Sequence, residues 1–214
     1  MAELTVILNA ATTRILVGLV LIAPAIAQNR YHSEPPAAAS GPAIDASVGY
    51  TYLAMQVPDA GSVNLNGVDA STGIHFTRRW GAVADASYVR GSSLLGTQHE
   101  SYVISAIAGP VFYPFERKET RFSVRVLGGA GLVDSAVPVT SPSYYLHGWV
   151  ARPSYAFGAG VEHALRGPFA LRFNGDYLRT AFVNPAGTVQ LQNNLRVTAS
   201  VVLRLKQGAV FSNR

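Results

Sequence analysis

Hydrophobic and polar residues alternate almost without error between Leu195 and Leu205, near the end of the chain. Leucine, valine and alanine occupy one face of this stretch, whereas Arg196, Thr198 and Arg204 lie on the other. This is the two-residue period of a β-strand with one apolar side. A strand of about ten residues, tilted by about 45°, is long enough to cross the hydrocarbon core of a bilayer. The stretch therefore predicts a membrane-spanning strand.

Seven further stretches alternate in the same way, at residues 46–56, 68–77, 82–90, 99–112, 120–133, 150–163 and 169–180. The connections between strands alternate in length, and the long ones are residues 57–67, 91–98, 134–149 and 181–193. Outer-membrane barrels have short turns on the periplasmic side and long loops outside. The pattern predicts an all-β fold, an eight-stranded antiparallel up-and-down transmembrane β-barrel over residues 46–206, followed by a C-terminal tail at 207–214.

The N-terminus has the features of a secretory signal peptide. Arg14 precedes an apolar run at residues 15–22, and the small-residue site Ala-Ile-Ala follows at 25–27. This order predicts a signal peptide over residues 1–27 that is cleaved after Ala27; a buried amphipathic helix is the alternative. Residues 28–45 contain several prolines and have no periodicity, which indicates a flexible periplasmic linker. We therefore expect an exported protein of the outer membrane of a Gram-negative cell.

Side-chain size indicates which face of the strands meets lipid, because alternation alone also fits a soluble barrel of the lipocalin type. Gly, Ser, Ala and Thr dominate the polar face and suit the narrow lumen of an eight-stranded barrel, whereas bulky residues lie on the apolar face. Aromatic residues gather near the strand ends, as in the two girdles of membrane barrels. The expected girdle residues are Phe76, Trp80, Tyr88, Tyr102, Phe112, Phe122, Tyr155, Phe169 and Tyr177, with Tyr113 and Phe115 beside them near the turns.

Three segments carry a family resemblance: Gly158-Ala159-Gly160-Val161-Glu162, Leu171 to Thr180, and Asn193 to Val197. They resemble the final three strands of the small outer-membrane β-barrel family of OmpA-like transmembrane domains. The similarity covers residues 45–205 and implies the fold far more than an activity. Partners expected of such a barrel are outer-membrane lipid, lipopolysaccharide and the barrel assembly machinery. The machinery often reads a terminal aromatic residue, for which Phe211 is the nearest candidate.

Composition argues against several other functions. The net charge of +5 is spread along the chain rather than gathered in a basic stripe with aromatics, so no nucleic-acid partner is expected. The densest basic groups, Arg78-Arg79 and Arg117-Lys118, lie in predicted turns, where they face anionic head groups at the membrane boundary. The chain has no cysteine, so neither a disulfide framework nor a thiolate site is indicated.

Charged residues on the polar face are expected to point into the lumen. A network of ion pairs is predicted for Asp85, Arg125, Glu162, Arg172, Asp176, Arg196 and Arg204, with Asp69 and His75 also facing inward. Counting residues from the turns gives a lower level, formed by Arg125, Glu162, Arg172 and Arg204, and a higher level with Asp176 and Arg196. In so narrow a lumen, buried charges are expected to pair and form a plug. The alternative is a gated pore for ions or small solutes.

Catalysis is suggested only by His99-Glu100-Ser101, which resembles the His-x-Ser arrangement of a lipid-A deacylase on a similar barrel. His99 and Ser101 would face the lumen, whereas a lipid-cleaving site must face lipid, so a lipid-modifying enzyme is the third hypothesis. His75, His147 and His163 share no metal-ligand spacing. We expect a non-enzymatic barrel without metal or cofactor, with a structural role or with an extracellular partner at its four long loops, which carry no recognisable docking motif.

Overall fold

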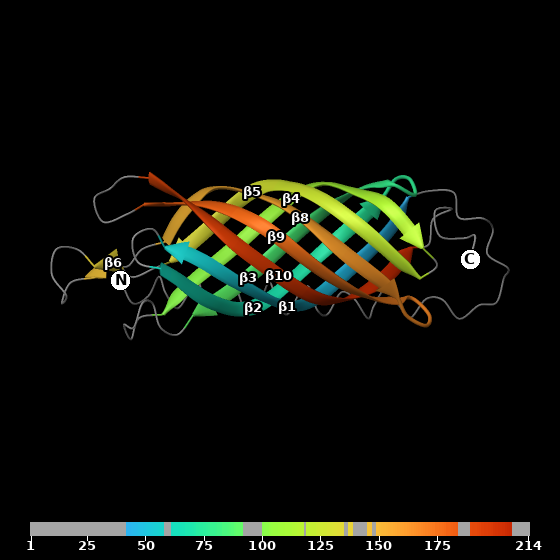
Figure 1. Ribbon diagram of the computed structural model, residues 1–214, viewed down its shortest axis with the longest axis horizontal. Coiled ribbons are helices and arrows are strands. Elements are labelled where there is room, and N and C mark those ends of the chain that lie inside the picture. Colours follow the sequence, from blue (N-terminus) through green and yellow to red (C-terminus); the bar gives the residue numbers. More distant parts are fainter. Residues whose placement is uncertain are drawn as a thin grey trace. The chain divides into compact units, whose positions relative to one another are not determined.

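Eight long β-strands form one barrel. The computed structural model describes residues 42–57, 61–91, 100–117, 119–134, 137–138, 145–146, 149–183 and 189–206. The barrel strands are β1 (Ala43–Val57), β2 (Gly61–His75), β3 (Trp80–Gly91), β4 (Ser101–Arg117), β5 (Thr120–Asp134), β8 (Trp149–Ala164), β9 (Phe169–Val183) and β10 (Val189–Lys206) (Figure 1). The short strands β6 (Val137–Pro138) and β7 (Tyr145–Leu146) pair with each other in the connection between β5 and β8.

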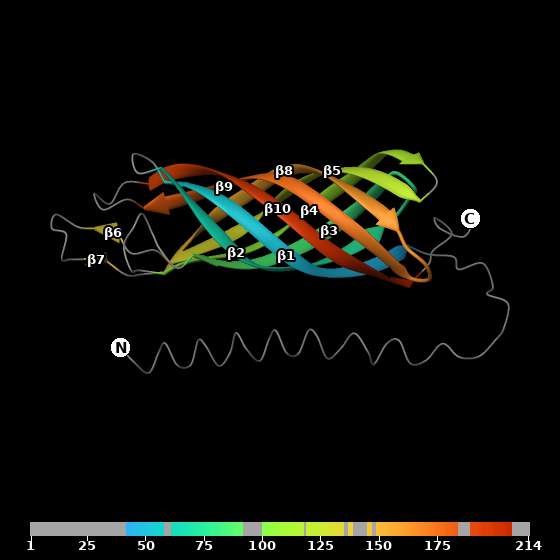
Figure 2. The same ribbon diagram turned by 60° about the horizontal axis from the view of Figure 1, so that its bottom comes forward.

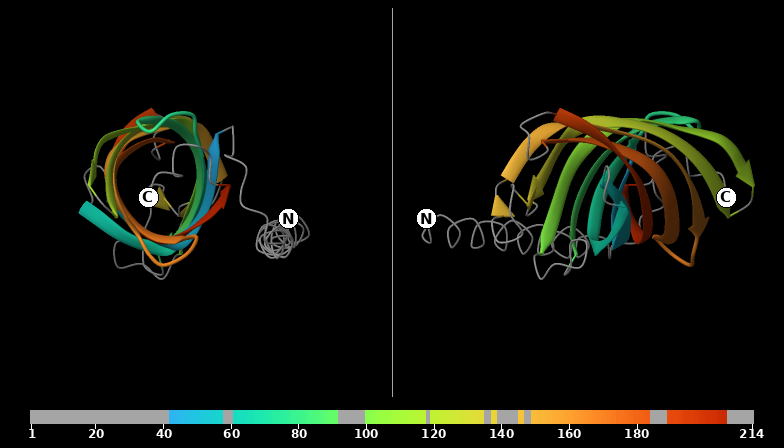
Figure 3. Two further views of the ribbon diagram at one scale, coloured as in Figure 1. Left: turned by 90° about the vertical axis from the view of Figure 1, so that its right-hand side faces the viewer. Right: turned by 60° about the vertical axis from the view of Figure 1, so that its left-hand side comes forward.

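Each barrel strand pairs with the barrel strands that precede and follow it, and β1 pairs with β10 to close the ring. All these pairings are antiparallel. The strands cross the barrel axis obliquely (Figure 2), and the ring is seen end-on in Figure 3. The predicted eight-stranded antiparallel barrel is therefore confirmed. Closure leaves no strand edge unpaired, which is the condition for a sheet inside a bilayer.

The two ends of the barrel have different connections. At one end, here called the turn end, residues 76–79, 118–119 and 165–168 form the turns. Gly167 lies in the last of these with a φ of 72°, a conformation that glycine adopts without strain. The opposite end, here called the loop end, has connections at residues 58–60, 92–100, 135–148 and 184–188. Among the described residues, no helix is long and apolar enough to cross a membrane.

Two strands extend further toward the loop end than the sequence predicts. β2 starts at Gly61 and β10 at Val189, so the predicted loops 57–67 and 181–193 are largely strand. The Asn and Gly residues of these stretches are poor strand formers, and for that reason the stretches resemble loops. Their backbone pairing with β1 and β9 overrides this local preference.

Other predicted segments lie partly or wholly outside the described residues. The signal peptide at 1–27, residues 92–98 of the loop 91–98, and the tail at 207–214 are outside them. The linker predicted at 28–45 lies outside as far as residue 41, but its last residues, Ala43 to Asp45, begin β1. The loop predicted at 134–149 contains β6 and β7.

Half-way along the barrel, the outer face is apolar and exposed. Val48, Val126, Phe157, Phe173 and Val201 are each exposed by between 47% and 59% of their surface. The intervening residues point inward and are buried, as the burial alternation along β3 shows. A continuous apolar belt of this kind is the surface that a barrel presents to acyl chains.

Candidate functional site: the barrel lumen

Five charged side chains from five strands meet inside the lumen and are here called the central network: Asp69, Asp85, Arg125, Asp176 and Arg196. Asp176 connects its two arginines and is fully buried. Arg125 donates to both carboxylate oxygens of Asp176, at 2.8 and 2.6 Å, and Arg196 donates to one of them at 3.0 and 2.8 Å. Bidentate hydrogen bonds between a guanidinium group and a carboxylate are among the strongest side-chain hydrogen bonds.

Asp85 joins the same two arginines a second time. It accepts a hydrogen bond from Arg196 at 2.7 Å and one from Arg125 at 3.3 Å. The Oδ2 atom of Asp69 lies 3.9 Å from Nη1 of Arg196 and accepts no hydrogen bond within the described part of the chain. Burial of a charge costs free energy unless opposite charges and hydrogen bonds compensate it. Sharing two guanidinium groups among three carboxylates supplies that compensation here.

A second cluster, here called the turn-end network, contains Asp45, His75, Glu162, Arg172 and Arg204. Arg172 lies between two carboxylates: its Nη2 is 3.2 Å from both oxygens of Asp45 and 2.7 Å from Glu162. Arg204 donates to the other oxygen of Glu162 at 2.9 Å. His75 Nε2 lies 2.5 Å from Asp45 Oδ2. The cluster thus links β1, β2, β8, β9 and β10 across the lumen.

All seven side chains predicted for the lumen network point inward, and each has an ion-pair partner there. The predicted grouping by level is wrong for Arg125, which joins the central network instead of the turn-end network. Counting residues from the turns ignores strand tilt and stagger, which place residues of equal count at different heights around a barrel. The sequence predicts Asp45 in the linker, but it lies on β1. Ile44 and Ala46 alternate with Asp45 and Ser47, and this two-residue period is the signal for a strand.

Tyr113 closes the lumen near the turn end. The sequence predicts Tyr113 beside the girdle, but its side chain is buried inside the barrel. Tyr113 follows the outward-facing Phe112, so the alternation along β4 turns it inward. The guanidinium carbon of Arg121, which is also buried, lies 3.9 Å from the centre of the Tyr113 ring, a cation–π contact. The ring of His75 lies 5.4 Å from the Tyr113 ring. Tyr113 thus connects the turn-end network to β5.

Two glycines of β8 let the charged side chains of β9 fit. A Cβ atom at Gly158 would overlap the Asp176 carboxylate, and one at Gly160 would overlap the amide oxygen of Asn174. Glycine is therefore required here because the side chain of the directly paired residue on the neighbouring strand β9 comes close.

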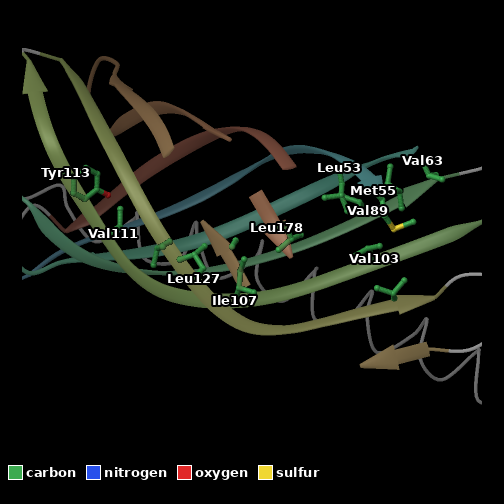
Figure 4. Packing of buried hydrophobic residues seen from close by; sticks show 14 residues of the cluster. Leu53, Met55, Val63, Val89, Val103, Ile107, Val111, Tyr113, Leu127 and Leu178 are labelled. Atoms are coloured by element: carbon green, nitrogen blue, oxygen red, sulfur yellow. The ribbon is translucent and has the colours of Figure 1, made fainter. Parts of the chain in front are cut away.

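Aliphatic side chains, instead of polar ones, fill one side of the lumen at the loop end. They are here called the mouth cluster and come from β1 to β5: Leu53, Met55, Val63, Leu65, Val89, Val103 and Val133. Each is at most 5% exposed, and Figure 4 shows five of them grouped where β1 ends and β2 begins. The prediction that bulky apolar residues lie on the outer face and small or charged residues on the inner face is wrong in this region.

The outer face of β1 and β2 at the mouth is correspondingly polar. Asn64 and Asn66 point outward from β2 and accept hydrogen bonds from the hydroxyl groups of Tyr52 and Tyr50, respectively. Gln56 is exposed near the end of β1. Apolar inside and polar outside is the arrangement of a barrel surrounded by water. Opposite the mouth cluster, on β9 and β10, the inner face remains polar, with Thr180, Gln192 and Asn194 all buried.

The predicted girdle residues all lie on the outer face. Phe76, Trp80, Phe122, Tyr155, Phe169 and Tyr177 are exposed, and Tyr88, Tyr102 and Phe112 are half-buried. Ring contacts connect neighbouring strands at both ends: Trp80 with Phe112 at 4.7 Å near the turns, and Tyr88 with Tyr102 at 6.1 Å near the loops.

The remaining candidate residues do not form a catalytic or metal centre in the part of the chain that the structure describes. Ser101 is fully buried and donates to the backbone carbonyl of Asp134 at 3.2 Å; His99 lies outside the described residues, as does His147. His163 is exposed and contacts Thr120 and Glu119. No group of three His, Asp or Glu side chains among the described residues is placed to hold a metal ion.

Solved structures similar to this chain are small outer-membrane barrels. Ail, the attachment invasion locus protein of Yersinia pestis, has a TM-score of 0.54 and 17% identity over 77% of this chain and 99% of that one. Neisserial surface protein A has a TM-score of 0.57 and 14% identity over 78% and 98%. The chain has the fold of the small eight-stranded outer-membrane barrels. The resemblance to OmpA-like barrels is thereby confirmed as one of fold. No protein-family model and no curated protein sequence matches the chain.

Proposed function

We propose that the chain is a non-enzymatic outer-membrane barrel whose lumen is closed by ion pairs and whose loop end stands in water, where it has a structural or surface-interaction role. The observation that carries the proposal is the burial of Asp176 between Arg125 and Arg196. A lumen that conducts ions must leave room for water beside its charged groups.

The packing of the central network supports a closed lumen. The side chains of Asp85, Asp176 and Arg196 are each at most 1% exposed, and that of Arg125 is 4% exposed. Charges packed this closely against one another favour a lumen without a water-filled channel. Eight strands enclose an interior just wide enough for side chains to fill.

The environment of Ser101 supports a non-enzymatic role. Its hydroxyl group donates to the backbone of Asp134 inside the barrel and does not face the apolar belt where a lipid substrate would lie. Lipid-A mass spectra of cells that express the protein or its Ser101→Ala variant are expected to be identical. A mass change with the wild type alone would instead support the lipid-modifying enzyme.

The location is tested by cell fractionation combined with a heat-modifiability gel. The expected result is an outer-membrane protein whose unheated form migrates differently from its heated form, because a closed barrel stays folded in detergent until it is boiled. Recovery in the soluble fraction would contradict the proposal.

Closure is tested by planar-bilayer recordings of the refolded full chain. We expect insertion without discrete conductance steps, both for the wild type and for Arg166→Gln, a substitution on the exposed β8–β9 turn. Steps in the wild type that change in Arg172→Gln or Glu162→Gln, but not in Arg166→Gln, would show that the turn-end network lines a pore and would overturn the plug.

A further inference from the structure

We propose that the turn end carries a binding site for the phosphate of an anionic glycerophospholipid. The site is a cavity of about 660 Å³ between the β2–β3 turn and the turn-end segments of β4 and β5, here called the turn-end pocket. Its lining includes Arg78, Arg79, Phe115, Glu116, Arg117 and Phe122. The inference rests on the proposed membrane location, because the occupant is a lipid.

The charge of the turn-end pocket selects an anion. Three arginines line it against one glutamate, and Arg78 Nη2 lies 3.9 Å from Glu116 Oε2 with the Arg78 side chain 70% exposed. Among the described residues, neither Arg79 nor Arg117 has an ion-pair partner. Guanidinium groups bind phosphate oxygens through two parallel hydrogen bonds.

Backbone hydrogen bonds hold the β2–β3 turn against β4 before any ligand binds. The amide of Tyr113 donates to the carbonyl of Arg79 at 2.8 Å, which joins β4 to the β2–β3 turn. Within that turn, the Thr77 hydroxyl accepts from the amides of Arg79 and Trp80 at 3.2 and 2.9 Å. The arginines therefore project from a preorganised backbone, which lowers the entropic cost of binding.

The apolar side of the turn-end pocket distinguishes a lipid from a soluble phosphate. Phe115 is 70% exposed and Phe122 is 48% exposed, and both line the same cavity as the arginines. Phe76, the first residue of the β2–β3 turn, and Trp80, the first residue of β3, are also exposed at the turn end. Basic groups next to aromatic side chains at a strand end match a lipid, with its phosphate at the arginines and an acyl chain along the aromatic rings.

The two tryptophans of the chain provide the measurement. Trp80 adjoins Arg79 at the turn end, and Trp149 is similarly exposed at the loop end. The full chain is refolded into vesicles as two single-tryptophan forms, Trp149→Phe and Trp80→Phe. Fluorescence quenching by brominated phosphatidylglycerol is then compared with quenching by brominated phosphatidylcholine at equal mole fractions.

We expect the relative binding constant at Trp80 to favour phosphatidylglycerol by about fivefold or more, because each basic residue near the surface strengthens acidic-lipid binding by roughly fivefold. The preference should disappear in Arg79→Gln/Arg117→Gln. It should persist in Arg90→Gln/Arg152→Gln, a matched loss of two exposed arginines elsewhere on the barrel. Trp149 should show no comparable preference.

Several results would overturn the site. Equal quenching of Trp80 by both lipids would do so, as would a preference that survives Arg79→Gln/Arg117→Gln. Loss of the preference in inorganic phosphate, but not in sodium chloride of the same ionic strength, would show a soluble-anion site instead of a lipid site. Absence of quenching by either lipid at either tryptophan is a different result: it would show that the barrel is not in the bilayer and would contradict the proposed function.

Discussion

Half-way along the barrel the outward side chains are apolar and the inward ones combine the ion-paired central network with buried aliphatic residues such as Ile107 and Leu127, whereas at the mouth the outward side chains of β1 and β2 are largely polar and the inward ones are aliphatic. On β1 and β2 the change occurs at one height. Thr51 pairs with Gly67, and the next inward pair toward the loop end is Leu53 with Leu65. On β3 and β4, Val89 pairs with Val103 at the mouth, but buried aliphatic residues continue on the other side of the Ser87–Ser105 pair, where Ile107 pairs with Asp85.

This inversion follows from what surrounds each region. A strand in which apolar and polar residues alternate has one apolar and one polar face. Where the strand lies in lipid, the apolar face turns toward the acyl chains. Where the same strand continues into water, the outer face must be polar, and the alternation then leaves the inner face apolar. The height at which the phase changes therefore marks the proposed outer surface of the bilayer, near Tyr52 and Asn66.

The largest effect is expected from breaking the central network. Arg196→Ala removes three of the hydrogen bonds to Asp176 and Asp85 and leaves those buried carboxylates to Arg125 alone. The free energy of unfolding in vesicles, measured with urea, should fall by about 4 kcal/mol. Arg204→Ala is the control, because Arg204 lies outside the central network and its side chain is 12% exposed, against 1% for Arg196. Equal losses in the two variants would contradict a central network that is more deeply buried.

A slightly smaller loss of stability is expected from a substitution in the mouth cluster. Leu65 is fully buried, so Leu65→Ala should lower the free energy of unfolding by about 3 kcal/mol through lost burial and a residual cavity. Leu195→Ala, on the outer face where the side chain is 55% exposed, should cost about 1 kcal/mol or less. If both variants lose the same amount, the mouth is not the packed core that its burial indicates.

The fold could be predicted from the sequence because the two-residue period is a local signal, present in each strand separately. The ion-pair partners inside the lumen could not be predicted from the sequence. The contact between Arg125 and Asp176 depends on the tilt and stagger of the strands, which are set by closure of the barrel. The mouth was missed for another reason. Val63 and Leu65 alternate with Asn64 and Asn66 as clearly as the other strands do, but in the opposite phase, and asparagine suggested a loop.

A smaller difference in stability is expected between substitutions on the outer face half-way along the barrel and on the outer face of the mouth. Val48 is outward and exposed half-way along β1, so Val48→Arg places a charge in the proposed hydrocarbon core and should cost about 2 kcal/mol or more. Asn64→Arg, on the outer face of the mouth, should cost between about 0 and 1 kcal/mol, because the charge stays in water. Both are measured by urea unfolding in vesicles. A large cost for Asn64→Arg would place the mouth inside the bilayer.

The smallest effect concerns the hydrogen bond from the Tyr52 hydroxyl to Asn64 Oδ1, 2.7 Å long on the outer face of the mouth. In water, both groups exchange this bond for bonds to solvent, so its net contribution should be only about 0.5 kcal/mol. In hydrocarbon, the same bond would be worth more, because a lone hydroxyl or amide has no other partner there. A double-mutant cycle with Tyr52→Phe and Asn64→Ala isolates the interaction from the side-chain losses. A coupling free energy above about 1.5 kcal/mol would place this pair in lipid, and the phase change would then no longer mark the membrane surface.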